Sequence, residues 1–161
     1  MNEEKKEIWE WRNELSVGVS VIDEDHKKLL GFLNELEYIN NSGAASKQGA
    51  IESVISDLMD YTEYHFKREE VLMQACGYPG LKTHKQVHEI LKAQTQNLVD
   101  DYKRDSLSFD SNVFCAFLRS WWLEHISVMD KDYESWMRDK DDVIDRTNTG
   151  FEHARQRNKS Q

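Results

Sequence analysis

The sequence predicts an all-α protein, an up-down-up-down antiparallel four-helix bundle with an N-terminal arm and a C-terminal extension. The chain of 161 residues contains one proline and seven glycines, the residues that most often interrupt helices. Four segments also repeat apolar residues every three or four positions, and short turn-rich stretches separate them. Amphipathic segments joined by short connections are typical of an antiparallel bundle.

Each bundle helix is expected where such an apolar stripe runs between turn formers. The stripe of the first helix contains Leu29, Leu33 and Leu36, and the stretch "NNSGAAS" follows it. "CGYPG" and "DSLSFDS" end the second and third helices, because Gly, Pro, Asp and Ser favour turns. The four helices are therefore expected at about residues 23–38, 46–75, 81–104 and 112–137.

The two ends of the chain lie outside this pattern. Residues 1–138 are interpreted as the bundle together with its arm, in which Trp9 and Trp11 are expected to pack over the helices. Residues 139–161 are interpreted as a charged C-terminal extension, which is expected either to form a short helix at about 151–157 or to fray.

Composition excludes several classes of protein. The net charge of −9 and the pI near 5.1 argue against nucleic acid as a partner, because phosphate binding needs clustered Lys and Arg. No apolar run reaches the ~20 residues that a membrane span requires, and the first residues lack the apolar region of a signal peptide. Cys76 and Cys115 are expected to be reduced thiols. A cytoplasmic protein is the resulting expectation.

Five of the six histidines fall at inward or near-inward positions of the predicted helices. A single histidine on an apolar face is usually a hydrogen-bonded core residue, but burying five imidazoles with two carboxylates would cost several kcal/mol unless something satisfies them. Two metal ions would do so, since bundle cores build di-metal sites from facing helices. The candidate metal ligands are His26, His65, Glu69, His84, His88, His125 and Asp130.

The same residues carry a resemblance to a known family. The stretches "SVGVSVIDEDHKKLLGFLNEL", "YTEYHFKREEVLMQACGYPGLKTHKQVH" and "EHISVMDKDY" resemble the hemerythrin family, in particular bacteriohemerythrins, and the likeness covers about residues 8–137. It implies two Fe ions with an oxo or hydroxo bridge and no catalytic residues. His84, His88 and His125 would hold one iron, His26 and His65 the other, and Glu69 and Asp130 would bridge both.

The resemblance implies reversible O2 binding at the one open iron position, for storage, delivery or scavenging, in a protein that is not an enzyme. Two alternatives remain open. The charged extension suggests a signalling module that senses O2, NO or redox state and is read by a protein partner. The open iron would also suit a di-iron peroxidase or an NO-consuming enzyme. Five imidazoles with only two carboxylates favour reversible O2 binding over oxidation of a substrate. Carboxylate-rich di-iron sites carry more anionic charge, and less anionic charge is expected to stabilise high-valent iron less well.

Two positions near the last histidine depart from expectation. Where the family typically has leucine, three residues before His125, this chain has Trp122. Its side chain would either narrow the O2 pocket and offer an N–H donor, or rotate away and pack between helices. Asp130 follows His125 by five residues, about 500° of helical rotation, so a local irregularity such as a π-bulge is predicted at about 126–130. The sixth histidine, His153, is expected to be a bystander.

Overall fold

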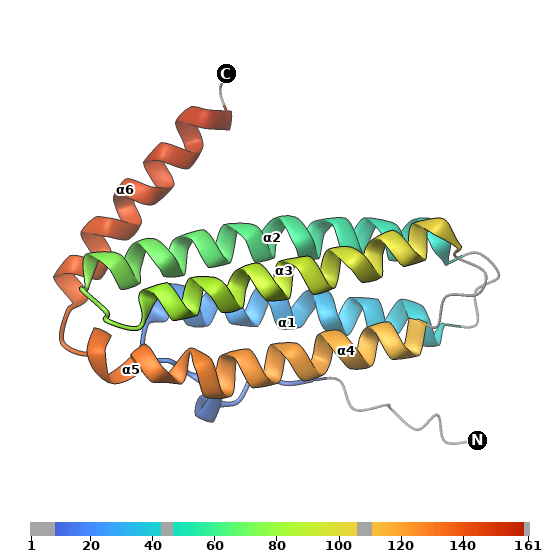
Figure 1. The fold of residues 1–161 in the computed structure, drawn as a ribbon, viewed down its shortest axis with the longest axis horizontal. Coiled ribbons are helices and arrows are strands. Elements are labelled where there is room, and N and C mark those ends of the chain that lie inside the picture. The colour runs from blue at the N-terminus through green and yellow to red at the C-terminus, as the bar shows by residue number, and fades with distance from the viewer. Residues whose placement is uncertain (1–8, 43–46, 106–110, 160–161) are drawn as a thin grey trace.

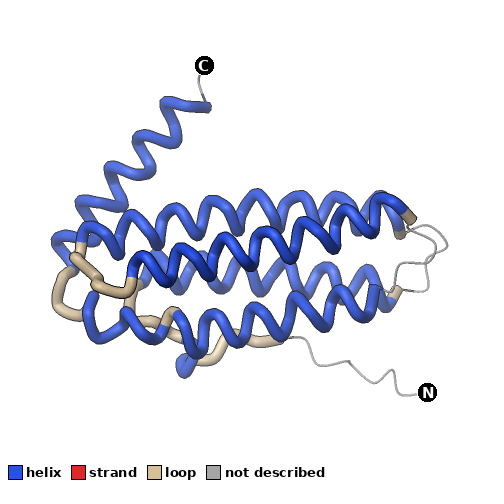
Figure 2. The backbone as a smooth tube through the Cα atoms, in the orientation of Figure 1, coloured by secondary structure: helices blue, strands red, loops and turns tan. Residues whose placement is uncertain are grey.

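The computed structural model describes residues 9–42, 47–105 and 111–159, and these ranges form a bundle of four helices with a further helix at its end (Figures 1 and 2). Successive helices run in opposite directions, so the predicted up-down-up-down bundle is confirmed. The connections at 43–46 and 106–110 lie outside the described residues. The bundle helices are α1 (Ser20–Asn41), α2 (Gln48–Ala75), α3 (Leu81–Arg104) and α4 (Ser111–Glu124).

Helix α1 begins one turn earlier than predicted. Asp23, expected at the helix start, lies in the first turn, and its carboxylate accepts hydrogen bonds from the Val17 N–H at 2.9 Å and the Ser16 hydroxyl at 2.5 Å. These bonds tie the end of the arm to the helix. A carboxylate in the first turn also complements the positive end of the helix dipole.

The last predicted helix is interrupted at the point where an irregularity was expected. Helix α4 continues into a π-helical turn, His125–Met129, and then into α5 (Lys131–Met137). The Asp130 N–H donates to the His125 carbonyl at 2.9 Å, an i+5 bond that closes a wider turn than the α-helical i+4 bond. The predicted irregularity is thus confirmed.

The N-terminal arm packs along the bundle as predicted. Trp9, Trp11 and Leu15 are partly buried and pack against the apolar core of the bundle. The Trp9 backbone also exchanges two hydrogen bonds with the Asn34 side-chain amide, at 2.9 and 2.8 Å. These bonds give the Trp9 N–H and C=O groups partners where the bundle shields them from water.

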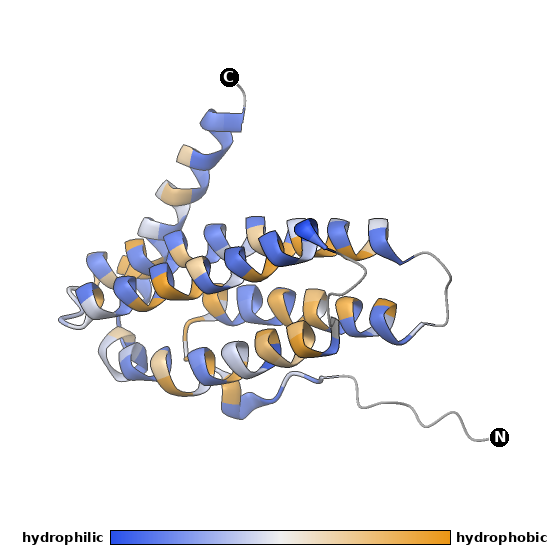
Figure 3. Cartoon of the chain, turned by 45° about the vertical axis from the view of Figure 1, so that its right-hand side comes forward, coloured by the Kyte–Doolittle hydropathy of each residue, from blue (hydrophilic) through white to orange (hydrophobic). Residues whose placement is uncertain are grey.

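The buried apolar side chains form two clusters, and the bundle helices carry apolar residues along one side (Figure 3). The main core fills the part of the bundle towards the connections at 43–46 and 106–110, and includes Leu33, Leu58 and Leu118. The end cluster lies at the opposite end, where Ile22, Met73 and Tyr133 meet. The candidate ligands lie between the two clusters along each helix.

The C-terminal extension forms one continuous helix, α6 (Asp141–Lys159), rather than the short helix or frayed end that the sequence suggested. Ile144, 5% exposed, inserts into the end cluster and anchors the start of α6. The helix packs against α2 and then projects beyond the bundle (Figure 1). Docking on α2 explains why a sequence with few apolar residues is helical here, since tertiary packing supplies most helix stability.

Candidate metal centre

Side chains of α1, α2, α3 and the π-helical turn converge in the middle of the bundle. All seven residues predicted as metal ligands are buried there. Their donor atoms form two groups, each with all its donors within 4.8 Å of one another. The first group contains Glu69, His84, His88 and His125, and the second contains His26, His65, Glu69 and Asp130.

The first group, called the three-histidine group below, is contributed mainly by α3 and the π-helical turn. His88 Nε2 and His125 Nε2 face each other at 3.3 Å, close to the ~3 Å that separates two nitrogens bound at right angles to one metal ion at ~2.1 Å. Asp130 Oδ1 lies 3.2 Å from His84 Nε2 and 3.1 Å from His125 Nε2. This carboxylate therefore borders the three-histidine group as well as its own.

The second group, called the two-histidine group, pairs helices α1 and α2. Asp130 Oδ2 lies 3.1 Å from His26 Nε2, so its two oxygens face different groups. Glu69 Oε2 lies 3.5 Å from His65 Nε2 and 3.3 Å from His88 Nε2, so this carboxylate also reaches both groups. Two carboxylates between two sets of imidazoles is the arrangement expected of bridging ligands.

The π-helical turn brings His125 and Asp130 to the same centre. On a regular α-helix a five-residue offset would turn the two side chains well apart. The wider turn closed by the Asp130 N–H bond absorbs the extra residue. Both side chains then point inwards and approach to 3.1 Å.

The buried charges in the centre shift one another's pKa values. Burial lowers the pKa of His84, but its close contacts with the Asp130 and Glu69 carboxylates outweigh burial and raise that pKa to about 10. Burial and Glu69 raise the pKa of Asp130, yet the charge of His125 and close contacts with His26 and His84 hold it at about 2. Without metal, the carboxylates are ionised and protonated imidazoles neutralise them. Metal ions would replace those protons.

Further side chains, those of Asp25, Glu70 and Tyr133, hold the candidate ligands in place, and the sequence analysis did not identify them. His65 Nδ1 lies 3.4 Å from Asp25 Oδ2, and His88 Nδ1 lies 2.8 Å from Glu70 Oε1. The Tyr133 hydroxyl donates to Glu69 Oε1. Hydrogen bonds of this kind fix which nitrogen of each imidazole faces the metal. The only sequence signal for two of them was adjacency, because Asp25 precedes His26 and Glu70 follows Glu69.

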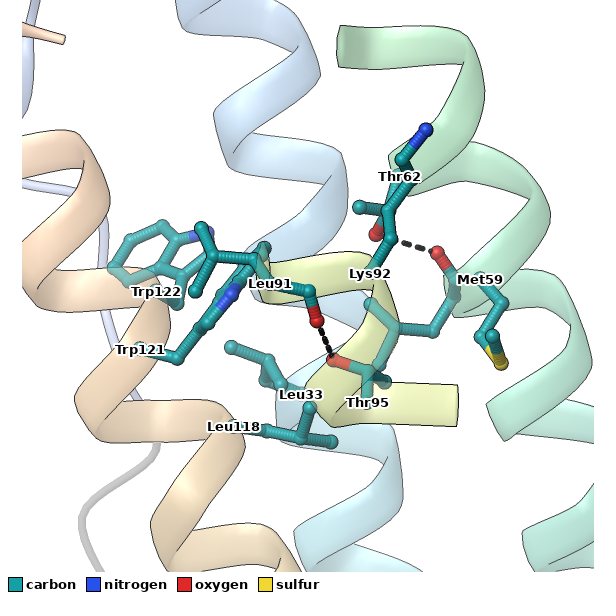
Figure 4. A pocket seen from close by; sticks show the side chains of 10 residues that line it. Leu33, Met59, Thr62, Leu91, Lys92, Thr95, Leu118, Trp121 and Trp122 are labelled. Carbon is teal, nitrogen blue, oxygen red and sulfur yellow. Dashed lines mark hydrogen bonds between the residues drawn. The ribbon is translucent and has the colours of Figure 1, made fainter. Parts of the chain in front are cut away.

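An apolar cavity of about 30 Å³ occupies the next layer of the bundle (Figure 4). Thr62, Leu91 and Trp122 line it, and each lies one helical turn from a candidate histidine ligand. The Thr62 hydroxyl donates to the Leu58 carbonyl at 2.7 Å, and so presents no free donor to the cavity. The volume leaves room for one small molecule, since a cavity needs about 10–15 Å³ of such space to hold a water molecule.

Both tryptophans before His125 contribute to this layer. The Trp121 ring stacks on His125 with 5.7 Å between ring centroids and 14° between planes. Trp122 is 1% exposed and packs in the main core, where it also lines the cavity. His153 is exposed on α6 and belongs to neither donor group.

The donor set fits a pair of metal ions. Among the described residues, buried donor atoms at the centre without a hydrogen-bond partner include both nitrogens of His26, His65 Nε2, His84 Nε2, Glu69 Oε2 and both oxygens of Asp130. Leaving so many polar atoms unpaired in a core is costly. Nitrogen and carboxylate ligands in this ratio suit first-row transition metals. Fold and donors together define a four-helix bundle whose core holds two adjoining histidine-rich clusters able to bind metal ions.

Comparison with known proteins gives the same class. Residues 17–137 match the family model of the hemerythrin HHE cation binding domain. A bacteriohemerythrin of Stenotrophomonas maltophilia is 34% identical over 76% of this chain and 77% of its own length. One of Clostridium acetobutylicum is 32% identical over 76% of this chain and 96% of its own. A wild-type hemerythrin crystal structure is 26% identical, with a TM-score of 0.73, over 81% of this chain and 98% of that chain.

The chain therefore belongs to the hemerythrin family. The resemblance inferred from the sequence is confirmed, and family membership implies a metal centre where the two donor groups lie. Within the described ranges, every helix is too short or too polar to cross a membrane.

Proposed function

We propose that this protein binds dioxygen reversibly at a di-iron centre held by the seven converging residues. The observation that carries the proposal is the asymmetry of the two donor groups. One contains three imidazoles and the other only two, while Glu69 and Asp130 are within reach of both. The metal ion with fewer protein ligands keeps a position for a small molecule, as reactive metal sites do. His26 and His65 would hold this ion.

The geometry of the two donor groups supports a division of ligand roles. His84, His88 and His125 would bind the more saturated ion, and Glu69 and Asp130 would bridge the pair together with an oxo or hydroxo group. Two ferrous ions, when bound, supply the electrons that a reversible dioxygen carrier exchanges with its ligand. The protein's own contribution is to keep five neutral imidazoles and two carboxylates in a dry, rigid interior.

The cavity beside the centre supports binding of a small apolar gas. Leu33, Leu91 and Leu118 supply apolar walls, and the bulk of Trp122 limits the space. An apolar pocket of this size admits a diatomic molecule and disfavours water, which needs several polar partners. Exclusion of water would protect the bound state from irreversible oxidation of the metal.

The test is an absorption spectrum of iron-loaded, reduced protein recorded without oxygen, after admission of air, and after removal of air. A charge-transfer band that appears with oxygen and disappears on its removal is the expected result. His65→Gln should abolish the oxygen-dependent band, because it removes a ligand of the two-histidine group. His153→Gln is the matched control and should retain it. Failure to take up iron, or a static oxidised spectrum, would contradict the proposal.

A signalling role is the second candidate, and the docking of α6 favours it. Phe151 of α6 packs on Tyr64 of α2 at 5.5 Å between ring centroids, and Arg155 lies over the same ring at 3.9 Å. Tyr64 directly precedes His65 on α2. A change at the metal could therefore alter how α6 is held. Reversible binding is compatible with this role, because a sensor also needs an exchangeable ligand.

A further inference from the structure

A chain of charged contacts runs from the metal centre to the inner face of α6. Glu152 accepts hydrogen bonds from the Tyr64 hydroxyl and from Arg68 Nη2, both on α2. Arg68 Nη1 donates to Asp25 Oδ1 on α1 at 3.0 Å. Asp25 Oδ2 in turn lies 3.4 Å from His65 Nδ1. Three helices thus contribute one continuous path from α6 to a candidate ligand.

Because Asp25 and Arg68 are buried, a change at Glu152, the outer end of the path, should affect both of them. Asp25 is 1% exposed and Arg68 is 9% exposed, so neither charge can be solvated fully if its partner moves. Asp25 Oδ1 also accepts a hydrogen bond from the Tyr61 hydroxyl at 2.6 Å, which holds that oxygen in place. The guanidinium of Arg68 is planar and bonds a different carboxylate through each terminal nitrogen. Its orientation therefore depends on Glu152 as well as on Asp25.

Asp25 controls the direction in which His65 presents its donor atom. A proton on Nδ1 that is shared with Asp25 leaves Nε2 for the metal, and His65 Nε2 is the atom that faces Glu69 at 3.5 Å. The contact of 3.4 Å between Nδ1 and Asp25 is long for a hydrogen bond. A small shift of Asp25 would strengthen or break it.

We propose that Glu152 is a positioning residue of the metal centre, which acts on His65 through Arg68 and Asp25 and so couples docking of α6 to binding at the two-histidine group. The metal half of this proposal rests on the di-metal function proposed above. Coupling is reciprocal: if docked α6 favours metal binding at His65, bound metal favours docking of α6 to the same degree. A change in the docking of α6 would be transmitted to its projecting end (Figure 1).

The first experiment uses the metal-free full chain. The ¹⁵N shifts of His65 Nδ1 and Nε2 are measured by NMR in the wild type and in Glu152→Gln, which keeps the shape of the side chain and removes its charge. Asp145→Asn is the matched control, because Asp145 is an exposed acidic residue of the same helix. We expect Glu152→Gln to shift the His65 nitrogens and Asp145→Asn to leave them in place. His84 serves as the internal reference. Equal shifts in both variants, no shift at His65, or a comparable shift at His84 would overturn the positioning role.

The second experiment measures amide hydrogen exchange of residues 145–159 with and without Co²⁺, which binds imidazole without oxygen chemistry. We expect exchange in the wild type to slow roughly threefold on loading, the scale of a partly exposed ion pair, and the effect to disappear in Glu152→Gln. The same exchange rates with and without bound Co²⁺ would overturn the coupling. If calorimetry shows that the wild type takes up no Co²⁺, the di-metal proposal and the coupling both fall, while the NMR result still decides the positioning role.

Discussion

The metal-free protein is expected to lose stability as pH rises above neutrality, and His84 determines the slope. The folded-state pKa of His84 is raised to about 10, because close contacts with the Asp130 and Glu69 carboxylates outweigh its burial. The unfolded value is near 6.5. The stability that the proton confers is therefore complete below about pH 6.5 and is lost as pH rises towards 10. In this window, each proton that the folded protein keeps and the unfolded chain has lost lowers the free energy of unfolding by about 1.4 kcal/mol per pH unit.

Between pH 7 and 9 this amounts to a loss of about 3 kcal/mol for His84 alone. The slope is steeper if His65 contributes: burial lowers its pKa, but Glu69 and Asp25 raise it by more. The assay is chemical denaturation of the metal-free protein at several pH values and constant salt. His84→Gln should make the slope shallower by about 1.4 kcal/mol per pH unit. A free energy of unfolding that stays level or increases over this range would refute the assignment of a protonated His84 to the metal-free state.

Three further outcomes follow from the same contacts. Loading with Co²⁺ at pH 8 should release protons into a weakly buffered solution, because metal displaces them from His84 and His65, and uptake without proton release would contradict the charge arrangement. Ile144→Ala should lower the free energy of unfolding by about 2–4 kcal/mol in chemical denaturation, since Ile144 is 5% exposed in the end cluster; a loss under 1 kcal/mol would mean that α6 is only loosely docked. Tyr133→Phe should lower the free energy of unfolding of the metal-free protein by about 1–3 kcal/mol, because Glu69 Oε1 loses its hydrogen-bond donor. An unchanged free energy of unfolding would show that this bond does not stabilise the fold.

The four helices could be predicted because their stripes are periodic and their ends carry turn formers. Helix α3 begins and ends where "CGYPG" and "DSLSFDS" placed it, at Leu81 and Arg104. Helix α1 was predicted too short because Asp23 was interpreted as the helix start. Its carboxylate instead binds Ser16 and Val17 from the first turn, a contact between the arm and the helix that local propensity does not contain.

The convergence of the candidate ligands could be predicted for a related reason. Each of the five histidines continues an apolar stripe, so helical periodicity alone directs all of them inwards. Even the misfit of Asp130 was informative, because its five-residue offset required the irregular turn that occurs at His125–Met129.

The partners of the ligands could not be predicted, since they depend on pairings between distant segments. Asp25 and His65 lie 40 residues apart, and Arg68 and Glu152 lie 84 apart. The length of the helix in the C-terminal extension was underestimated for the same reason. Ile144 and Phe151 are two turns apart on one face of α6, but the stretch is otherwise polar and the pattern is short. The helix is stabilised by packing of Ile144 in the end cluster and of Phe151 on α2, contacts that the local sequence does not contain.

Separation of the main core from the metal centre determines how the protein responds to loss of metal. Small zinc domains unfold without their ion because metal ligation replaces a core. Here the main core holds Leu33, Leu58, Leu118 and Trp122 in the half of the bundle beyond the ligands. Ionised carboxylates and protonated imidazoles can neutralise the centre itself. Metal-free protein is thus expected to remain folded with a protonated centre, so that protons and metal ions compete for one set of atoms. Stability of the metal-free form should then fall with pH over the same range in which metal affinity rises, and a chain that unfolds completely on removal of metal at pH 7 would contradict this account.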